Sequence, residues 1–215
     1  LTISERNPSE TPSAAGGRAI WPWPRSCVQH GEMSGDLQRV WIEGVTAPDG
    51  GAGATGVVSA LLAAGADGVR FQAVSATDGL RLRAAGSSRR RSRKEISIGD
   101  IDALGRDATY DLVVDATDVT TATAVVDSAR RAGMLENLWL VSTELATLVQ
   151  VREESPATRL LHECDPARER HGAERHAATL RAEGLEGVLV AEDKVGLGAT
   201  TLMHRFGRMV AVTGV

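Results

Sequence analysis

The fold is decided by residues 112 to 153, which read LVVDATDVTTATAVVDSARRAGMLENLWLVSTELATLVQVRE. Two short apolar runs in this stretch, at 112–114 and 138–141, have the length and composition of buried strands. Each is followed by a segment with the apolar spacing of a helix, at 121–132 and at 145–153. A strand, a helix and a second strand in this order predict parallel strands joined by right-handed crossovers. We therefore expect an α/β fold.

The same alternation extends to both sides of this stretch. Upstream, the pattern predicts a strand at 40–42, a helix at 57–64 closed by Gly65, a hairpin of strands 69–74 and 80–83 around Asp78-Gly79, and a helix at 98–104. Downstream, it predicts strands at 159–162, 187–191 and 209–212, with helices at 174–182 and 200–206. Seven or eight such units favour a β/α barrel of the TIM type over an open sheet. No Gly-x-Gly-x-x-Gly joins a strand to a helix, so a dinucleotide-binding fold has little support.

The composition argues against some classes of binding partner. The chain has 24 Lys and Arg against 28 Asp and Glu, a formal net charge of −4. Such a chain has no general attraction for nucleic acid, and an aromatic content of 3% does not suit proteins that stack on bases. We expect no sequence-specific nucleic-acid partner. No apolar run reaches the roughly 18 residues that span a bilayer, so no transmembrane segment is expected.

The two cysteines, Cys27 and Cys164, lie far apart and lack the spacing of a metal site. Free thiols in a reducing compartment are the simpler interpretation. The amino end also lacks the apolar core of a secretory signal. The predicted location is therefore the cytoplasm.

Residues 1–36 differ from the remainder of the chain. They are rich in Ser, Pro, Gly and Glu and show neither a helical nor a strand period. We expect them to form a disordered or non-native extension, with a single domain over 37–215. Because the chain begins with Leu, we also expect native translation to start at Met33. The exceptions are Trp21 and Trp23, which could dock on the barrel.

Several short motifs in one order resemble the glycerophosphodiester phosphodiesterase family. Residues 65–69, Gly-Ala-Asp-Gly-Val, followed by Asp78-Gly79, are similar to its G-A-D-G-V/I … D-G pattern. Leu148, Arg152 and Pro156 have the spacing of its L-x-x-x-R-x-x-x-P helix, and residues 203–213 resemble its H-x-x-G-x-x-V ending. The resemblance covers residues 39–215. It implies a TIM-type β/α barrel of the PLC-like phosphodiesterase kind, without the family's last helix and strand.

In that family, the resemblance implies, three carboxylates on two strands hold a divalent metal such as Mg²⁺ or Ca²⁺, and two histidines act as general acid and base. Here Arg70 and Gln72 stand at the first two carboxylate positions, and only Asp115 keeps the third. The first histidine position falls on residues 42–43 and the second on Ala85. We therefore expect no metal, no other cofactor and no catalytic residue.

Two interpretations of the former site stay open. Arg70 could replace the metal by pairing with Glu43 and Asp115, or the three residues could keep a pocket for an anion or a polyol. The predicted function is a phosphodiesterase-like domain without activity that binds a phosphorylated or polyol ligand or a protein. The alternative is a weak or altered phosphoric diester hydrolase of lipid metabolism that uses Glu43 and Asp115.

Two further groups of residues could bind ligands. Arg89, Arg90 and Arg91 form part of a basic run after the predicted hairpin, which is either a solvated loop or a docking site for anionic headgroups or nucleic acid. His162, Cys164, His171 and His176 lack the spacing of a zinc site, and we expect a solvated helix surface there.

The closure of the barrel is left open by the sequence. After Val215 the barrel could stay open, be closed by the predicted hairpin strand, or be completed by a partner chain. Because an exposed strand edge invites pairing, a homodimer is predicted.

Overall fold

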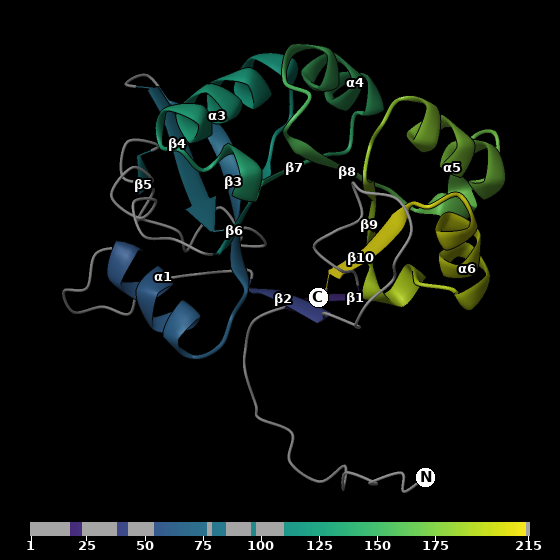
Figure 1. The fold of residues 1–215 in the computed structure, drawn as a ribbon, viewed down its shortest axis with the longest axis horizontal. Helices are drawn as coiled ribbons and strands as arrows, with labels where there is room; N and C mark the ends of the chain where they lie inside the picture. Colours follow the sequence, from purple (N-terminus) through teal and green to yellow (C-terminus); the bar gives the residue numbers. More distant parts are fainter. Residues whose placement is uncertain are drawn as a thin grey trace, which may run out of the picture.

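The computed structural model describes residues 18–22, 38–42, 54–76, 79–84, 96–97 and 110–213, in which short strands alternate with helices (Figure 1). The strands are β1 (Arg18–Pro22), β2 (Gln38–Ile42), β3 (Gly68–Ala76), β4 (Gly79–Ala84), β5 (Ile96–Ser97), β6 (Asp111–Asp115), β7 (Leu138–Ser142), β8 (Arg159–Glu163), β9 (Gly187–Ala191) and β10 (Met209–Thr213). The helices are α1 (Ala54–Ala63), α3 (Val119–Arg131), α4 (Leu145–Glu154), α5 (Ala173–Ala182) and α6 (Leu197–Arg205). Three 3-10 turns are η1 (Leu135–Asn137), η2 (Pro166–Arg168) and η3 (Glu192–Lys194).

The strands form one sheet that closes on itself. Its order is β2-β1-β10-β9-β8-β7-β6-β3-β4-β5, and a further pairing joins β2 to β3. The strands β4 and β5 therefore lie outside the ring and extend β3 as antiparallel neighbours. From β2 and β3 through β6 to β10, each ring pair is parallel. Helices α3 to α6 follow one another in an arc outside these strands (Figure 1). This is the TIM-type α/β architecture that the sequence predicts.

The exception among the ring strands is β1, which runs antiparallel between β2 and β10. It pairs with β2 along its length and with β10 through Ile20 opposite Val212. Without it, the facing edges of β2 and β10 would leave backbone N–H and C=O groups unpaired. The strand β1 lies before the predicted domain boundary at residue 36, and a chain that began at Met33 would not contain it. The edge of β10 is paired with β1 here, and the homodimer stays a prediction.

Each strand and helix that was predicted within the described residues is present. The predicted hairpin is formed by β3 and β4, with Ala76 opposite Gly79. The helix predicted at 98–104 lies outside the described residues. The strand β8 extends one residue beyond its predicted end, to Glu163, and this difference matters for the site.

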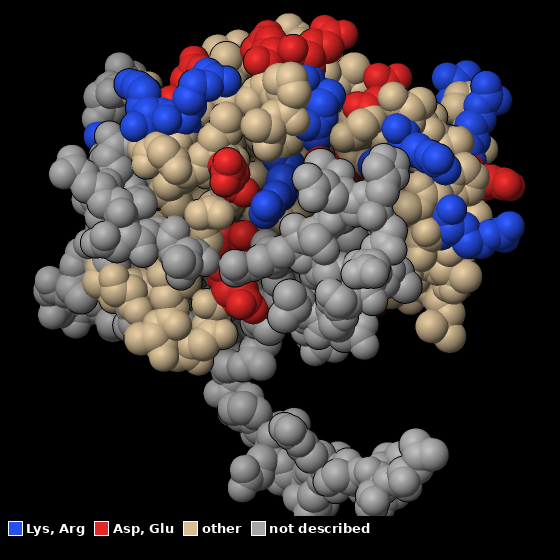
Figure 2. Space-filling view, in the orientation of Figure 1, with Lys and Arg blue, Asp and Glu red and all other residues tan. Residues whose placement is uncertain are grey.

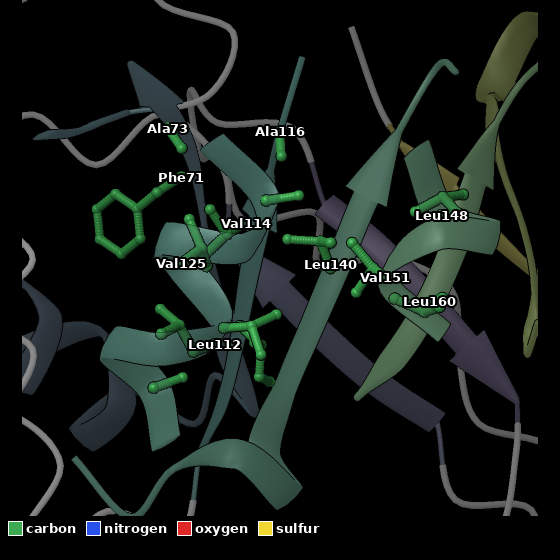
Figure 3. Packing of buried hydrophobic residues seen from close by; sticks show 14 of the residues in the cluster. Phe71, Ala73, Leu112, Val114, Ala116, Val125, Leu140, Leu148, Val151 and Leu160 are labelled. Atoms are coloured by element: carbon green, nitrogen blue, oxygen red, sulfur yellow. The ribbon is translucent and has the colours of Figure 1, made fainter. Parts of the chain in front are cut away.

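Alternation along the strands divides the core into two layers, because successive residues point to opposite faces. One layer lies between the sheet and the helices (Figure 3) and contains Phe71, Leu112, Val114, Val125, Leu140, Leu148 and Leu160. The other fills the barrel and contains Trp41, Val113, Trp139, Val141, Leu161, Leu189, Met209 and Ala211. Burial of one leucine side chain contributes about 1.5–3 kcal/mol. Strands that are buried on both faces have continuous apolar sequences, and the barrel strands have such sequences.

The floor of the barrel lies at the amino ends of the strands. Trp41 donates its indole N–H to Asp111, with 3.1 Å from Nε1 to Oδ2, and its ring centroid lies 5.4 Å from that of Trp139. The guanidinium of Arg159 lies 4.9 Å from the centroid of the Trp139 ring, and its Nη1 lies 3.8 Å from Oδ1 of Asp111. A Cβ at Gly68 would lie 2.4 Å from the carbonyl oxygen of Asp111. The close approach of β3 to β6 therefore requires glycine at this position.

Arg152 has a structural role that accounts for its place in the α4 motif. Its Nη2 lies 2.9 and 2.8 Å from the two carboxylate oxygens of Glu186, and its Nη1 donates to the carbonyl oxygen of Pro156. Glu186 also accepts the backbone N–H of Leu160 at 2.6 Å. Burial raises the pKa of Glu186, while Arg152 acts in the opposite direction. The pair fastens the end of α4 to the start of β8 and to the residue before β9.

Candidate functional site

Polar side chains gather at the carboxyl ends of the barrel strands. Asp115 ends β6, Glu163 ends β8 and Thr213 ends β10. Each lies two residues after a buried residue that fills the barrel, so each faces the interior. Arg70 lies on the same face of β3, two residues after Gly68. Since β/α barrels carry their ligand and catalytic groups at this end, these four residues are the candidate site; we call them the mouth cluster.

Arg70 joins the members of the mouth cluster. Its Nε lies 2.8 Å from Oδ1 of Asp115, and its Nη2 lies 2.9 Å from Oε2 of Glu163. Its Nη1 donates to Oγ1 of Thr213 at 3.3 Å. The three nitrogens thus reach three different strands, and the guanidinium ties β3 to β6, β8 and β10.

The exposure of the cluster is uneven. The side chain of Arg70 is 6% exposed, whereas those of Asp115 and Glu163 are 21% and 35% exposed. A buried guanidinium needs compensation by neighbouring acceptors, which the two carboxylates supply. With one positive and two negative charges, the cluster has a formal charge of −1. A molecule that enters the mouth meets carboxylate oxygens before it meets the cation.

The structure contains the predicted pairing of Arg70 with Asp115, but the second carboxylate is one that sequence reasoning missed. The predicted strand ended at His162, so the last inward-facing residue of β8, Glu163, was left out. A carboxylate at the carboxyl end of a barrel strand is the signal that could have found it. The predicted partner Glu43 lies outside the described residues.

Gln72 is the next inward-facing residue of β3 and lies opposite Asp115 in the sheet register. Its Oε1 accepts a hydrogen bond from Nη2 of Arg83 on β4 at 2.9 Å. A neutral amide that is already paired adds no charge to the mouth cluster. The remaining predicted positions lie outside the described residues: Ala85, Arg89, Arg90 and Arg91.

Asp118 is a further carboxylate near this end, but it caps α3. Its Oδ1 accepts the backbone N–H of Thr121 and its Oδ2 accepts the Thr121 hydroxyl, both at 2.8 Å. These hydrogen bonds hold the pKa of Asp118 below its usual range. An N-terminal cap of this kind stabilises a helix by about 1 kcal/mol.

Two of the histidines are buried, although a solvated surface was predicted for them. His162 and His176 are 5% and 6% exposed and contact each other between β8 and α5, outside the barrel. The predicted solvated surface is wrong for these two, because the pleat of β8 turns His162 away from the interior and toward α5. His171 is exposed as expected. In the described part of the chain, no histidine faces the barrel interior.

Charges of both signs are interspersed over the face of the molecule that Figure 2 shows. Such a surface gives no strong field of one sign from the residues drawn there. Within the described ranges, no helix combines the length and the apolar character that crossing a membrane requires.

Comparisons with known proteins identify the architecture. No family model matches the chain, and no curated protein matches it. A solved structure described as a glycerophosphoryl diester phosphodiesterase of Agrobacterium tumefaciens matches with a TM-score of 0.60 and 15% identity, over 73% of this chain and 76% of that one. One from Silicibacter pomeroyi gives 0.58 and 15%, over 72% and 75%. One from Galdieria sulphuraria gives 0.57 and 8%, over 71% and 73%. At these identities, the likeness shows the fold alone.

Proposed function

We propose that the chain is a glycerophosphodiester phosphodiesterase-like domain that has lost phosphodiester hydrolysis and acts as a binding module. The observation that carries this proposal is the position of Arg70, whose guanidinium lies between the carboxylates of Asp115 and Glu163. Metal-assisted hydrolysis needs a cation that polarises a phosphoryl oxygen and activates a water molecule. A guanidinium stays protonated and offers only N–H donors, so it cannot supply the nucleophile.

A divalent cation does not fit between these carboxylates while Arg70 is present. Oδ1 of Asp115 and Oε2 of Glu163 already accept from the guanidinium at 2.8 and 2.9 Å. A cation bound to the same oxygens would lie roughly 4 Å from the guanidinium charge, given metal–oxygen distances of about 2.0–2.6 Å. At an effective dielectric constant of 20, a double and a single positive charge at that separation repel by about 8 kcal/mol. Arg70 therefore stands in the place of the metal.

Phosphodiester hydrolysis also needs a residue that transfers a proton, and we infer that this residue is missing. Departure of an alkoxide from a phosphodiester needs a general acid, and histidine is the side chain suited to neutral pH. The positions that resemble the family's histidines hold Ala85 and residues 42–43. Among the described residues, the histidines lie on the outer face of the barrel wall, on helices, or, for His171, in the turn before α5. We therefore infer that neither a metal nor an acid is available at the mouth.

The ligand that suits the mouth cluster is a neutral polyol. Carboxylates that are more exposed than the cation accept hydrogen bonds from hydroxyl groups and repel a phosphate. Titration calorimetry with glycerol, inositol and glycerol 3-phosphate tests this. We expect heat from at least one polyol and none from the phosphate; tighter binding of glycerol 3-phosphate would overturn this choice of ligand.

Hydrolysis assays test the loss of activity. Glycerophosphocholine and bis-p-nitrophenyl phosphate are incubated with the full chain and added Mg²⁺, Ca²⁺ or Mn²⁺, beside an Asp115→Ala variant. We expect no turnover above that of the variant. Metal-dependent turnover that Asp115→Ala abolishes would show that the mouth cluster is catalytic.

The same assay decides the alternative function, a weak or altered phosphodiester hydrolase. The observation in its favour is that Asp115, the one carboxylate kept at a position resembling the family's metal site, remains partly exposed. That hydrolase would need Arg70 to move away from Asp115. An Arg70→Ala variant should then be more active than the parent chain, whereas we expect both to be inactive.

A further inference from the structure

A second polar cluster lies on the opposite side of the barrel wall from the mouth cluster. His162 faces outward from β8, Cys164 follows the strand, Glu169 follows η2, and His176 lies on α5. One ligand atom from each of the four residues lies within 4.8 Å of all the others. Both histidines are buried, and Cys164 and Glu169 are half-buried. We call these four residues the outer cluster.

Two distances in the outer cluster are close to the edges of a metal tetrahedron. Nδ1 of His162 lies 3.1 Å from Nε2 of His176, and Sγ of Cys164 lies 3.6 Å from the same nitrogen. Zinc–nitrogen bonds of about 2.0–2.1 Å and zinc–sulfur bonds of about 2.3 Å place tetrahedral ligands about 3.3 Å apart for two nitrogens and about 3.6 Å apart for nitrogen and sulfur. Little movement is needed to place an ion between them.

A hydrogen bond fixes His162 in the tautomer that could coordinate a metal ion through Nδ1. Its Nε2 lies 3.1 Å from the carbonyl oxygen of Thr143, which can only accept a hydrogen bond. In neutral His162 the proton is therefore on Nε2, and the lone pair of Nδ1 points toward His176. Histidines that ligate metals usually donate their other N–H to a carbonyl or carboxylate in this way.

The charges of the outer cluster suit a divalent ion. One thiolate and one carboxylate balance the two positive charges of Zn²⁺, and two neutral imidazoles complete four ligands. Neutrality matters because the site is largely buried and an unbalanced charge there is costly. Within the described part of the chain, the ion-pair contact of Glu169 is with His176, whose Nδ1 lies 3.7 Å from its Oε2. The mouth cluster also has two acidic groups, but there an arginine pairs with both, whereas among the described residues no arginine is in ion-pair contact with Glu169.

A hydrogen-bonded histidine pair alone is the simpler interpretation. It would explain the contact between His162 and His176, but it does not need a thiol and a carboxylate at the same point. Four residues from a strand, two positions in a loop and a helix converge here, although they are spread over 15 positions of the sequence, from 162 to 176. A shared ion gives all four groups one partner.

We propose that His162, Cys164, Glu169 and His176 bind one zinc ion, which fastens the loop after β8 to α5. Nitrogen and sulfur ligands favour zinc over Mg²⁺ or Ca²⁺, which prefer oxygen. Four protein ligands leave no open position, so the ion is structural and not catalytic. The site lies outside the barrel, so this inference does not depend on the proposed function.

Cobalt substitution of the full chain tests the site. The protein is stripped with a chelator and titrated with Co²⁺, and we expect intense visible bands of tetrahedral cobalt and a sulfur-to-cobalt charge-transfer band, both saturating at one ion per chain. Added Zn²⁺ should displace the cobalt. The variant Cys164→Ser should lose the charge-transfer band, and His176→Gln should weaken cobalt binding at least about tenfold. The matched control His171→Gln, at an exposed position, should behave as the parent chain.

Two spectroscopic results would overturn the site. One is the absence of tetrahedral cobalt bands in parent protein that circular dichroism shows to be folded. The other is a charge-transfer band that persists in Cys164→Ser, because the sulfur would then come from Cys27. If a variant is too unstable for the cobalt titration, thermal unfolding of the parent chain and of His171→Gln tests the site. Zinc should raise the Tm of the parent chain and of His171→Gln, and an unchanged Tm for both would also refute the proposal.

Discussion

The two ends of the barrel each pair an arginine with carboxylate, but with opposite exposure. On the floor, the carboxylate of Asp111 is 8% exposed and the side chain of Arg159 is 31% exposed. At the mouth, Arg70 is 6% exposed, while Asp115 and Glu163 are 21% and 35% exposed. On the floor, the carboxylate is thus the more buried partner of the ion pair. At the mouth, the guanidinium is the more buried partner and the two carboxylates are more exposed to solvent.

This reversal separates a structural end from the end at which we propose binding. The Asp111 carboxylate satisfies the indole N–H of Trp41 and supports apolar packing. The carboxylates of the mouth stay accessible to a ligand while their charge is partly balanced from within. In β/α barrels generally, the floor contributes stability and the mouth contributes function. Here the mouth also has a structural element, because Arg70 ties β3 to β6, β8 and β10.

The largest effect is expected from Arg70→Met, which removes the cation and leaves two carboxylates facing each other. The free energy of unfolding should fall by about 3 kcal/mol, since breaking a buried ion pair from one side leaves uncompensated charge. Urea denaturation at neutral pH measures it. The matched control is Arg130→Met, which breaks an ion pair whose side chains are 50% and 54% exposed and should change stability by less than about 1 kcal/mol. Equal effects at both positions would mean that the mouth cluster stabilises no more than a surface pair.

A smaller loss is expected on the floor from Asp111→Ala. Loss of the carboxylate leaves the Trp41 indole N–H without its acceptor, and an unsatisfied buried donor costs about 1–3 kcal/mol. Because the floor is far from the ligands, the heat of polyol binding per folded molecule should not change. A variant that kept its stability but lost polyol binding would contradict the division between the two ends.

The smallest effect at neutral pH concerns Tyr110, the residue before β6 and the one tyrosine of the chain. Burial raises the pKa of Tyr110 to about 12, against about 10 in an unfolded chain. The native state therefore holds this proton more tightly, so the contribution of Tyr110 to stability is complete below about pH 10 and is lost as the pH rises toward 12. Tyrosinate absorbance should show the higher midpoint in folded protein and the lower one in urea. A folded midpoint near 10 would mean that water reaches the hydroxyl.

Much of the architecture follows from local pattern. Short apolar runs and helical spacing placed the strands and helices from Gln38 to Thr213 to within a few residues, with the exception of the two-residue strand β5, because alternation of this kind has few packing solutions. The strand Arg18–Pro22 was not predicted, since its role comes from pairing with two edges that are remote in sequence. Such tertiary pairing overrides the composition of a segment rich in Pro and Gly.

Only part of the candidate site could be predicted from the sequence. The pairing of Arg70 with Asp115 was expected because the family resemblance places both residues at positions of metal-binding carboxylates. The second partner, Glu163, and the outer cluster were missed for different reasons. The predicted strand ended at His162, so Glu163, which faces the barrel interior, was left out. The outer cluster was set aside because its residues lack the sequence spacing of known zinc motifs, although strand, loop and helix bring them together in space.

The central claim, that Arg70 stands where a metal would be bound, is tested most directly by calorimetric titration of Ca²⁺ into the full chain and into Arg70→Glu. Calcium prefers oxygen ligands, so the outer cluster should not interfere. The parent chain should give no heat of binding, whereas Arg70→Glu, with three carboxylates at the mouth, should bind Ca²⁺ and gain Tm from it. Binding of Ca²⁺ by the parent chain that Asp115→Ala abolishes would contradict the account, because the carboxylates would then hold a metal in the presence of Arg70.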